Sequence, residues 1–117
     1  MTTASLTGPL EIGKASLLAQ WDLVHSDTVG AAAEFPDQTD AVVTITGTFD
    51  SATVVIQGSN DGTTYVTLTD PQGNAISKTS AAIEQITEVP RYIRPSMSGG
   101  VASEAVRVMI KATGAKR

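Results

Sequence analysis

The sequence contains no cysteine, a single histidine and few aromatic residues, and these absences exclude several kinds of site. Without cysteine there is no disulfide framework, no thiolate metal site and no cysteine nucleophile. A zinc site draws three or four ligands mainly from cysteine and histidine, and His25 is the one such residue. Aromatic residues make up 4% of the chain, too few for the stacking platforms of a glycosidase cleft. We therefore expect no metal, no cofactor and no enzymatic activity.

His25 lies near Asp22 and Asp27, which are residue types of a Ser-His-Asp triad. A triad also needs a nucleophile on a sharp turn, and no G-x-S-x-G pattern is present. The chain also lacks a P-loop, a Rossmann glycine pattern and an HExxH motif. We interpret His25 as a surface residue of an acidic loop.

The sequence shows neither a secretion signal nor a membrane span. Residues 1–5 carry no basic group and no apolar stretch of the kind that a signal peptide needs. No apolar run approaches the ~20 residues that cross a bilayer. We expect a soluble protein that is made in the cytoplasm and has no membrane partner.

Basic residues are scarce in the first two thirds of the chain. Residues 1–77 hold nine acids and one base, a sum of −8, whereas residues 78–117 hold three acids and seven bases, a sum of +4. Strands of the two segments either interleave in the fold, which mixes the charges, or form a dipolar module that meets its neighbours head to tail. The net charge of −4 and the absence of a basic-aromatic stripe disfavour nucleic acid as a partner.

Length and composition predict one all-β domain. A chain of 117 residues matches a common domain size, and threonine, serine, valine and glycine are typical of sheets and turns. Residues 1–14 are polar and carry the Gly8-Pro9 pair, so we expect an extended N-terminal arm there. Residues 15–117 are expected to form a single antiparallel β-sandwich, either jelly-roll or discoidin-like.

Alternation of apolar and polar residues predicts about eight strands. They are expected at 15–24, 41–49, 54–58, 64–68, 75–79, 83–89, 91–97 and 106–112, and the long connection at 26–40 offers a further short strand at 31–35. Because Pro95 has no N–H to donate, its strand is expected at a sheet edge or with a bulge. A short helix at 80–85 is the alternative in that region.

Two turns stand out. Asp61-Gly62 lies inside a hairpin that spans residues 52–69, and Gly62 supplies the positive φ that such a turn needs. Asp70-Pro71-Gln72-Gly73 has the residue order of a β-turn. A calcium site would need Asp50, Asp61 and Asp70 to meet at one end of the sandwich, but turn geometry already explains two of the three.

Three aromatic residues are candidates for stacking on a sugar. Trp21 lies on the apolar side of its strand and is interpreted as core. Tyr65 and Tyr92 point opposite to Val66 and Ile93, so they are interpreted as core or rim packing of the sandwich.

The segments VVIQGSNDGTTYVTL (54–68) and PRYIRP (90–95) resemble the hairpin and the later Arg-Tyr-hydrophobic-Arg strand of discoidin-like β-sandwich modules. With the turn at 70–74 between them, they also resemble small virion proteins of tailed bacteriophages. The second resemblance implies a sandwich on the outer capsid surface, often trimeric, that cements neighbouring major capsid protein subunits. A carbohydrate-binding or adhesion module of a phage tail or fibre is the first alternative, and a head–tail connector component is the second.

The residues expected to contact partners fall into two groups. Arm residues would latch onto a neighbouring subunit, and basic residues of the later strands would face acidic partner surfaces. The expected contact residues are Leu6, Pro9, Leu10, Ile12, Arg91, Arg94, Arg107 and Lys111. The expected partners are the major capsid protein and further copies of the chain itself, as a homotrimer or another homo-oligomer in the virion.

Overall fold

The computed structural model describes residues 2–13, 16–24, 27–36, 38–100 and 103–114. Within these ranges the chain forms twelve strands and no helix. The strands are β1 (Thr2–Ala4), β2 (Leu6–Gly13), β3 (Ser16–Val24), β4 (Asp27–Gly30), β5 (Ala33–Glu34), β6 (Gln38–Thr48), β7 (Ala52–Ser59), β8 (Val66–Thr67), β9 (Ser77–Lys78), β10 (Ala82–Ile86), β11 (Tyr92–Gly99) and β12 (Ala105–Gly114). The count exceeds the prediction because β1 and β2 form in the N-terminal segment and β4 forms in the connection that follows β3.

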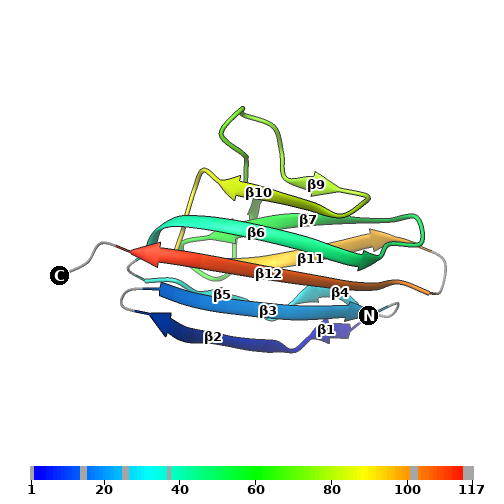
Figure 1. Ribbon diagram of the computed structural model, residues 1–117, viewed down its shortest axis with the longest axis horizontal. Coiled ribbons are helices and arrows are strands. Elements are labelled where there is room, and N and C mark those ends of the chain that lie inside the picture. Colours follow the sequence, from blue (N-terminus) through cyan, green and yellow to red (C-terminus); the bar gives the residue numbers. More distant parts are fainter. Residues whose placement is uncertain (1, 14–15, 25–26, 37, 101–102, 115–117) are drawn as a thin grey trace.

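The strands form two sheets that pack face to face (Figure 1). Sheet A has seven strands along the path β1-β4-β11-β7-β8, with β5 beside β11 and β9 beside β7. Sheet B has five strands in the order β10-β6-β12-β3-β2. The β1–β4 pairing is parallel, and the other pairings among named strands are antiparallel. The predicted all-β sandwich is confirmed.

Alternate residues of both sheets fill the space between them, as the period of two requires. Trp21 of β3 is fully buried and links the two sheets. Its Nε1 donates a hydrogen bond to the Ala31 carbonyl at 2.7 Å. A Cβ atom on Gly30 of β4 would lie 2.5 Å from Trp21 Cδ1 and 2.7 Å from Pro95 Cδ. Glycine is therefore required where β4 and β11 of sheet A pack against the indole, and Trp21 is core as predicted.

The prediction of an arm at residues 1–14 is wrong where the structure describes them. β1 pairs with β4 in sheet A, and β2 pairs with β3 at the edge of sheet B. Ala4 is buried, and Leu6 packs against the core. Pairing supplies partners for backbone N–H and C=O groups, so even this polar segment with Gly8-Pro9 joins the sandwich.

The strand predicted at 83–89 is present as β10, which pairs with β6 from Ala82 to Ile86, so the helix alternative at 80–85 is wrong. The prediction for Pro95 is also wrong. Pro95 lies in β11 between β7 and the strands β4 and β5, not at an edge, and the β7–β11 register shows no bulge. On the other side of β11, β5 pairs at Ile93 and β4 pairs at Ser96. The ladder on that side is therefore interrupted at Pro95, where the N–H is missing.

The charge segments of the sequence interleave. Strand β12 lies between β6 and β3, and β11 lies between β7 and β4, so strands of the second, basic segment lie between strands of the first, acidic segment in both sheets. This confirms the mixed arrangement and leaves no support for a head-to-tail dipole.

Both predicted turns are present. Gly62 has φ of 79°, and the Gly73 N–H donates to the Asp70 carbonyl at 2.9 Å. The last pair of the hairpin ladder joins Gly58 to Val66, so its loop is wider than a two-residue turn. Val66, next to that loop, is 65% exposed rather than packed.

Candidate assembly surface

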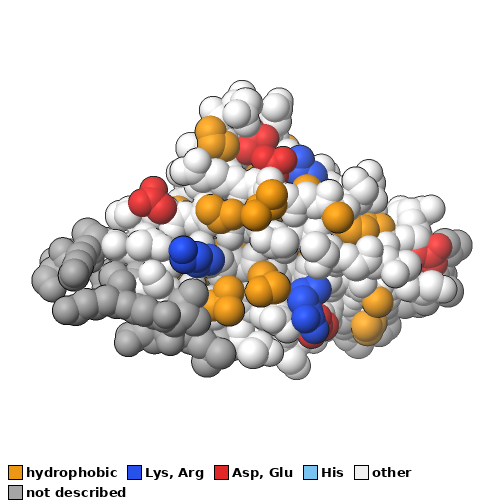
Figure 2. Space-filling view, viewed as in Figure 1, with side chains coloured by type: hydrophobic (Ala, Val, Ile, Leu, Met, Phe, Trp, Pro, Cys, Tyr) orange, Lys and Arg blue, Asp and Glu red, His pale blue; other side chains and the backbone are white. Residues whose placement is uncertain are grey.

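The outer face of sheet B carries most of the exposed large hydrophobic side chains of the described chain. Val24, Val42 and Ile83 are 50%, 39% and 67% exposed, and the fourth such residue, Val66, lies elsewhere. Half-buried Leu18 and Met109 lie on the same face. In Figure 2, orange side chains and two blue groups lie over the strands of sheet B. An apolar cluster on a flat sheet face is typical of a protein contact surface.

The strand register brings these residues together in rows. One row contains Ile83, Thr44, Met109 and Gln20, from β10, β6, β12 and β3 in turn. The next row contains Gln85, Val42, Lys111 and Leu18. Directly paired residues of neighbouring strands share a face, so these side chains form one continuous surface.

Charges on this face are few and partly paired. Arg107 Nε lies 2.8 Å from Asp22 Oδ1, and both side chains are more than half exposed. The hydrogen bond and the charge of Asp22 raise the pKa of Arg107, which stays protonated in any case. A shallow hollow of about 450 Å³ lies beside this pair and includes Val24 and Thr46 in its lining.

The outer face of sheet A is polar by contrast. Its central strand β11 presents Tyr92, Arg94, Ser96 and Ser98 outward. The Arg94 guanidinium lies 3.7 Å from the centroid of the Tyr65 ring, and its Nε donates to Gln57 Oε1 at 3.0 Å. This stack covers part of Tyr65, so the rim-packing interpretation fits better than an open sugar platform.

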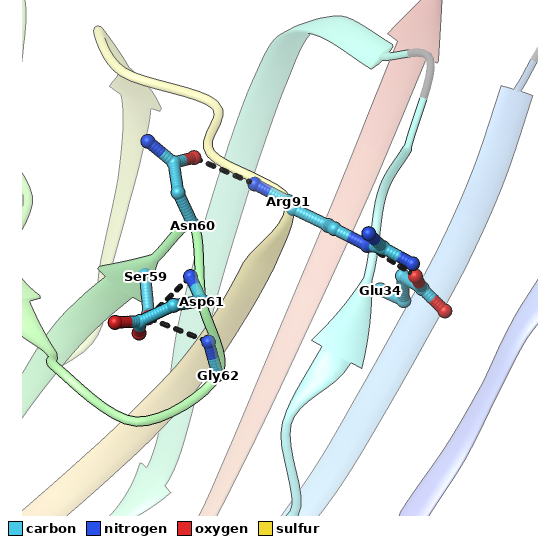
Figure 3. Close-up of polar contacts among 6 residues, drawn as sticks. All are labelled: Glu34, Ser59, Asn60, Asp61, Gly62 and Arg91. Atoms are coloured by element: carbon cyan, nitrogen blue, oxygen red, sulfur yellow. Dashed lines mark hydrogen bonds and ion pairs between the residues drawn. The ribbon is translucent and has the colours of Figure 1, made fainter.

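Arg91 and the β7–β8 loop form a polar network at one end of sheet A (Figure 3). Arg91 is ion-paired with Glu34, and its N–H donates to Asn60 Oδ1. Asp61 Oδ1 accepts hydrogen bonds from the Thr63 and Thr64 N–H groups, each at 2.8 Å.

Hydrogen bonds to the Asp61 carboxylate lower its pKa. The Thr64 N–H has the largest effect, followed by the Thr63 N–H and the Ser59 hydroxyl, and the pKa falls to about 2. Ser59 Oγ in turn accepts from the Gly62 N–H at 2.9 Å. The carboxylate therefore holds the loop, as the turn interpretation predicted.

The structure does not bring the eight predicted contact residues together. Arg94 lies on the outer face of sheet A, with Arg91 just before β11, whereas Arg107 and Lys111 lie on the outer face of sheet B. Leu6 packs against the core, and the other arm residues lie in β2, with side chains outside the described set: Pro9, Leu10 and Ile12. Their role as contact residues remains a prediction.

The remaining candidates have structural explanations or lie outside the described residues. Asp50 accepts from the Ser103 N–H, and Asp70 accepts from the Gln72 and Asn74 N–H groups. The described part of the chain contains no group of three metal-ligating side chains. It also contains no helix long and apolar enough to cross a bilayer. His25 is not among the described residues.

Sequence reasoning did not single out the apolar residues of the outer face of sheet B. A signal was present, because Leu18 and Val24 occupy the strand positions opposite to Trp21, where polar residues are usual. Val42 likewise occupies an outward-facing position of β6, between the buried residues Ala41 and Val43. Which of these residues become neighbours depends on strand order, which alternation does not determine.

No protein-family model matches the chain, and neither does any curated protein. One similar solved structure belongs to work on Bacillus endospore appendages, described as a novel family of disulfide-linked pili. The identity is 12% and the TM-score is 0.34, over 97% of this chain and 93% of that chain. A similarity of this size carries no argument about fold or function.

Proposed function

We propose that this chain is a non-enzymatic structural protein of a tailed-phage virion. It decorates the outer capsid surface and stabilises it by bridging neighbouring major capsid protein subunits. The segments at 54–68 and 90–95 support this proposal by their resemblance to small phage virion proteins, and the β-sandwich agrees with that resemblance. The observation that carries it is the cluster of exposed apolar side chains on the outer face of sheet B.

The shape of this face fits a macromolecular partner better than a small ligand. Small-molecule sites are concave and bury most of their ligand, whereas this face is a sheet surface with one shallow hollow near its end. Val42 and Ile83 are exposed to solvent, so a flat partner surface can bury them without any change in the fold. On a capsid lattice, weak contacts of this kind repeat and add up to firm attachment.

The number of copies on the particle tests the proposal. The protein is purified with the particle that it accompanies, and mass analysis and electron microscopy give its location and copy number. Hundreds of copies on the head are expected for a cement protein, because the contact repeats over the lattice. About a dozen copies in a ring would instead indicate a head–tail connector, and a handful at the tail tip would indicate an adhesion module.

Matched substitutions test whether the outer face of sheet B makes the contact. The test variant combines Val42→Lys and Ile83→Lys, both on exposed positions of that face. The control combines Thr53→Lys and Ser96→Lys, both on the outer face of sheet A. The test variant is expected to lose most of its particle occupancy while the control keeps it. Equal occupancy of the two variants would contradict the proposed contact face.

A further inference from the structure

We propose that residues 2–13 exchange between copies of this chain, so that β1 and β2 of one copy occupy the edges of β4 and β3 in another. The partner is a second copy of the chain. This inference goes beyond the proposed function, because it concerns contacts between copies and does not need a capsid.

The N-terminal segment, residues 2–13, supplies the outermost strand of each sheet on one side of the sandwich (Figure 1). In the described ladders, β1 pairs with β4 alone and β2 pairs with β3 alone. The segment can therefore leave without breaking the ladders between the remaining strands. Its departure opens one edge in each sheet.

The N-terminal segment is held less firmly than the central strands. Among its described side chains, Ala4 is buried and Leu6 packs against the core, whereas Thr3, Ser5 and Thr7 are exposed. The β2–β3 register shifts twice and the β1–β4 register shifts once, whereas the β3–β12 register runs without a shift. An irregular edge strand with few buried side chains opens at a lower free energy than a regular central ladder.

The edges that the segment leaves open fit the same segment of another copy. The Ala31 N–H donates to the Ala4 carbonyl at 2.9 Å on the sheet A side, and Leu6 lies opposite Trp21 on the sheet B side. One incoming chain must serve both edges, with a small residue at the first and an apolar residue two positions later. Residues 2–13 of a second copy provide the same contacts, so exchange sacrifices none of them.

The short connection between β2 and β3 favours exchange. Gly13 pairs with Ser16, so only two residues separate the paired ends of the two strands. Connections this short promote exchange of the element that precedes them. The segment holds one acid, Glu11, and no base, so it brings little charge to a second chain of net charge −4.

Disulfide trapping between two single-cysteine variants tests the exchange, because the chain has no cysteine of its own. Thr7 lies opposite Gln20 in the β2–β3 register, so the two side chains share one face of sheet B. Whole chains with Thr7→Cys are mixed at high concentration with whole chains with Gln20→Cys and are then oxidised. A disulfide between the two kinds of chain is expected, because β2 of one copy lies beside β3 of the other.

The matched control mixes Thr7→Cys chains with Thr53→Cys chains. Thr53 is half-buried like Gln20 but lies on the outer face of sheet A, away from β2. Mass spectrometry measures the mixed disulfide, and the yield with Gln20→Cys is expected to exceed that with Thr53→Cys at least about tenfold. Circular dichroism shows that each variant is folded.

Two results would overturn the inference. One is an equal yield of mixed disulfide from the two mixtures. The other is a single chain with both Thr7→Cys and Gln20→Cys that forms no internal disulfide in dilute solution, because the register itself would then be wrong. Decoration of phage heads without mixed disulfides would overturn the exchange alone, and exchange by a chain that is absent from phage heads would overturn the proposed function alone.

Discussion

The outer faces of the two sheets have similar strand backbones but carry different kinds of side chain. The outer face of sheet A has polar groups that satisfy one another, such as Arg94 with Gln57 and Tyr65. The outer face of sheet B leaves Val24, Val42 and Ile83 in contact with solvent. Side chains that already have partners within the chain gain little from a new neighbour, whereas exposed apolar side chains gain by burial. The comparison therefore separates a face that maintains the fold from a face suited to assembly.

The largest predicted effect is a loss of stability that affects both faces, because the two sheets share one core. Gly30→Ala places a Cβ 2.5 Å from Trp21 Cδ1, so the indole or sheet A must move. We expect a loss of about 2–3 kcal/mol in the free energy of unfolding, the usual cost of overpacking. Urea denaturation measures it. Gly73→Ala is the control, since its Cβ would meet nothing within 4 Å and only the positive φ opposes it. If Gly30→Ala lowers the free energy of unfolding no more than Gly73→Ala does, the close packing of Gly30 against Trp21 is contradicted.

The second prediction compares one arginine from each face. Arg94 is half-buried, stacked on Tyr65 and bonded to Gln57, so Arg94→Ala is expected to cost about 1–2 kcal/mol of stability. Arg107 forms an exposed ion pair with Asp22, and Arg107→Ala is expected to cost at most about 0.5 kcal/mol. Thermal unfolding at two salt concentrations measures both. Equal losses of stability from Arg94→Ala and Arg107→Ala would mean that the polar contacts of sheet A do not stabilise the fold more than those of sheet B.

Sequence alone predicted the parts of the fold that depend on local pattern. Alternation along β3, β6 and β12 identified which side chains enter the core, and the Asp61-Gly62 and Asp70–Gly73 turns followed from backbone preferences. These features depend on residues near one another in the chain. For the same reason, the assignment of the central strands to a sandwich was correct.

The features that sequence missed depend on residues far apart. Whether residues 2–13 stay free or pair is decided by the open edges of β4 and β3, which the N-terminal sequence does not reveal. Pro95 occupies a central strand because the neighbouring ladder is interrupted beside it. The apolar cluster arises only when the register sets Leu18, Val42 and Met109 side by side.

The third prediction exchanges the surface character of the two faces. Val42→Thr with Ile83→Thr makes the outer face of sheet B more polar, and Thr53→Val with Ser96→Val makes the outer face of sheet A more apolar. Because these side chains are at least partly exposed, each substitution is expected to change stability by no more than about 0.5 kcal/mol. Binding of an apolar dye is expected to fall in the first variant and rise in the second. A large stability loss in the first variant would show that the exposed side chains serve the fold.

The smallest predicted effect concerns the β7–β8 loop at the edge of sheet A. The pKa of Asp61 is lowered from 3.8 to about 2, chiefly by the Thr64 and Thr63 N–H groups. The folded state therefore binds this proton less readily than the unfolded chain. The stabilisation is present above pH ~4 and is lost as the pH falls towards 2.

Asp61→Asn keeps an oxygen that accepts hydrogen bonds but removes the titration. The melting temperature of the wild type is therefore expected to fall more steeply between pH 5 and pH 2 than that of Asp61→Asn, when both are followed by circular dichroism. Comparing the two slopes cancels the contribution of the other carboxylates to the pH dependence. Glu88 is one of these, since its pKa is also lowered by its hydrogen bonds to Thr69. Identical slopes would mean that the loop does not depend on the Asp61 charge.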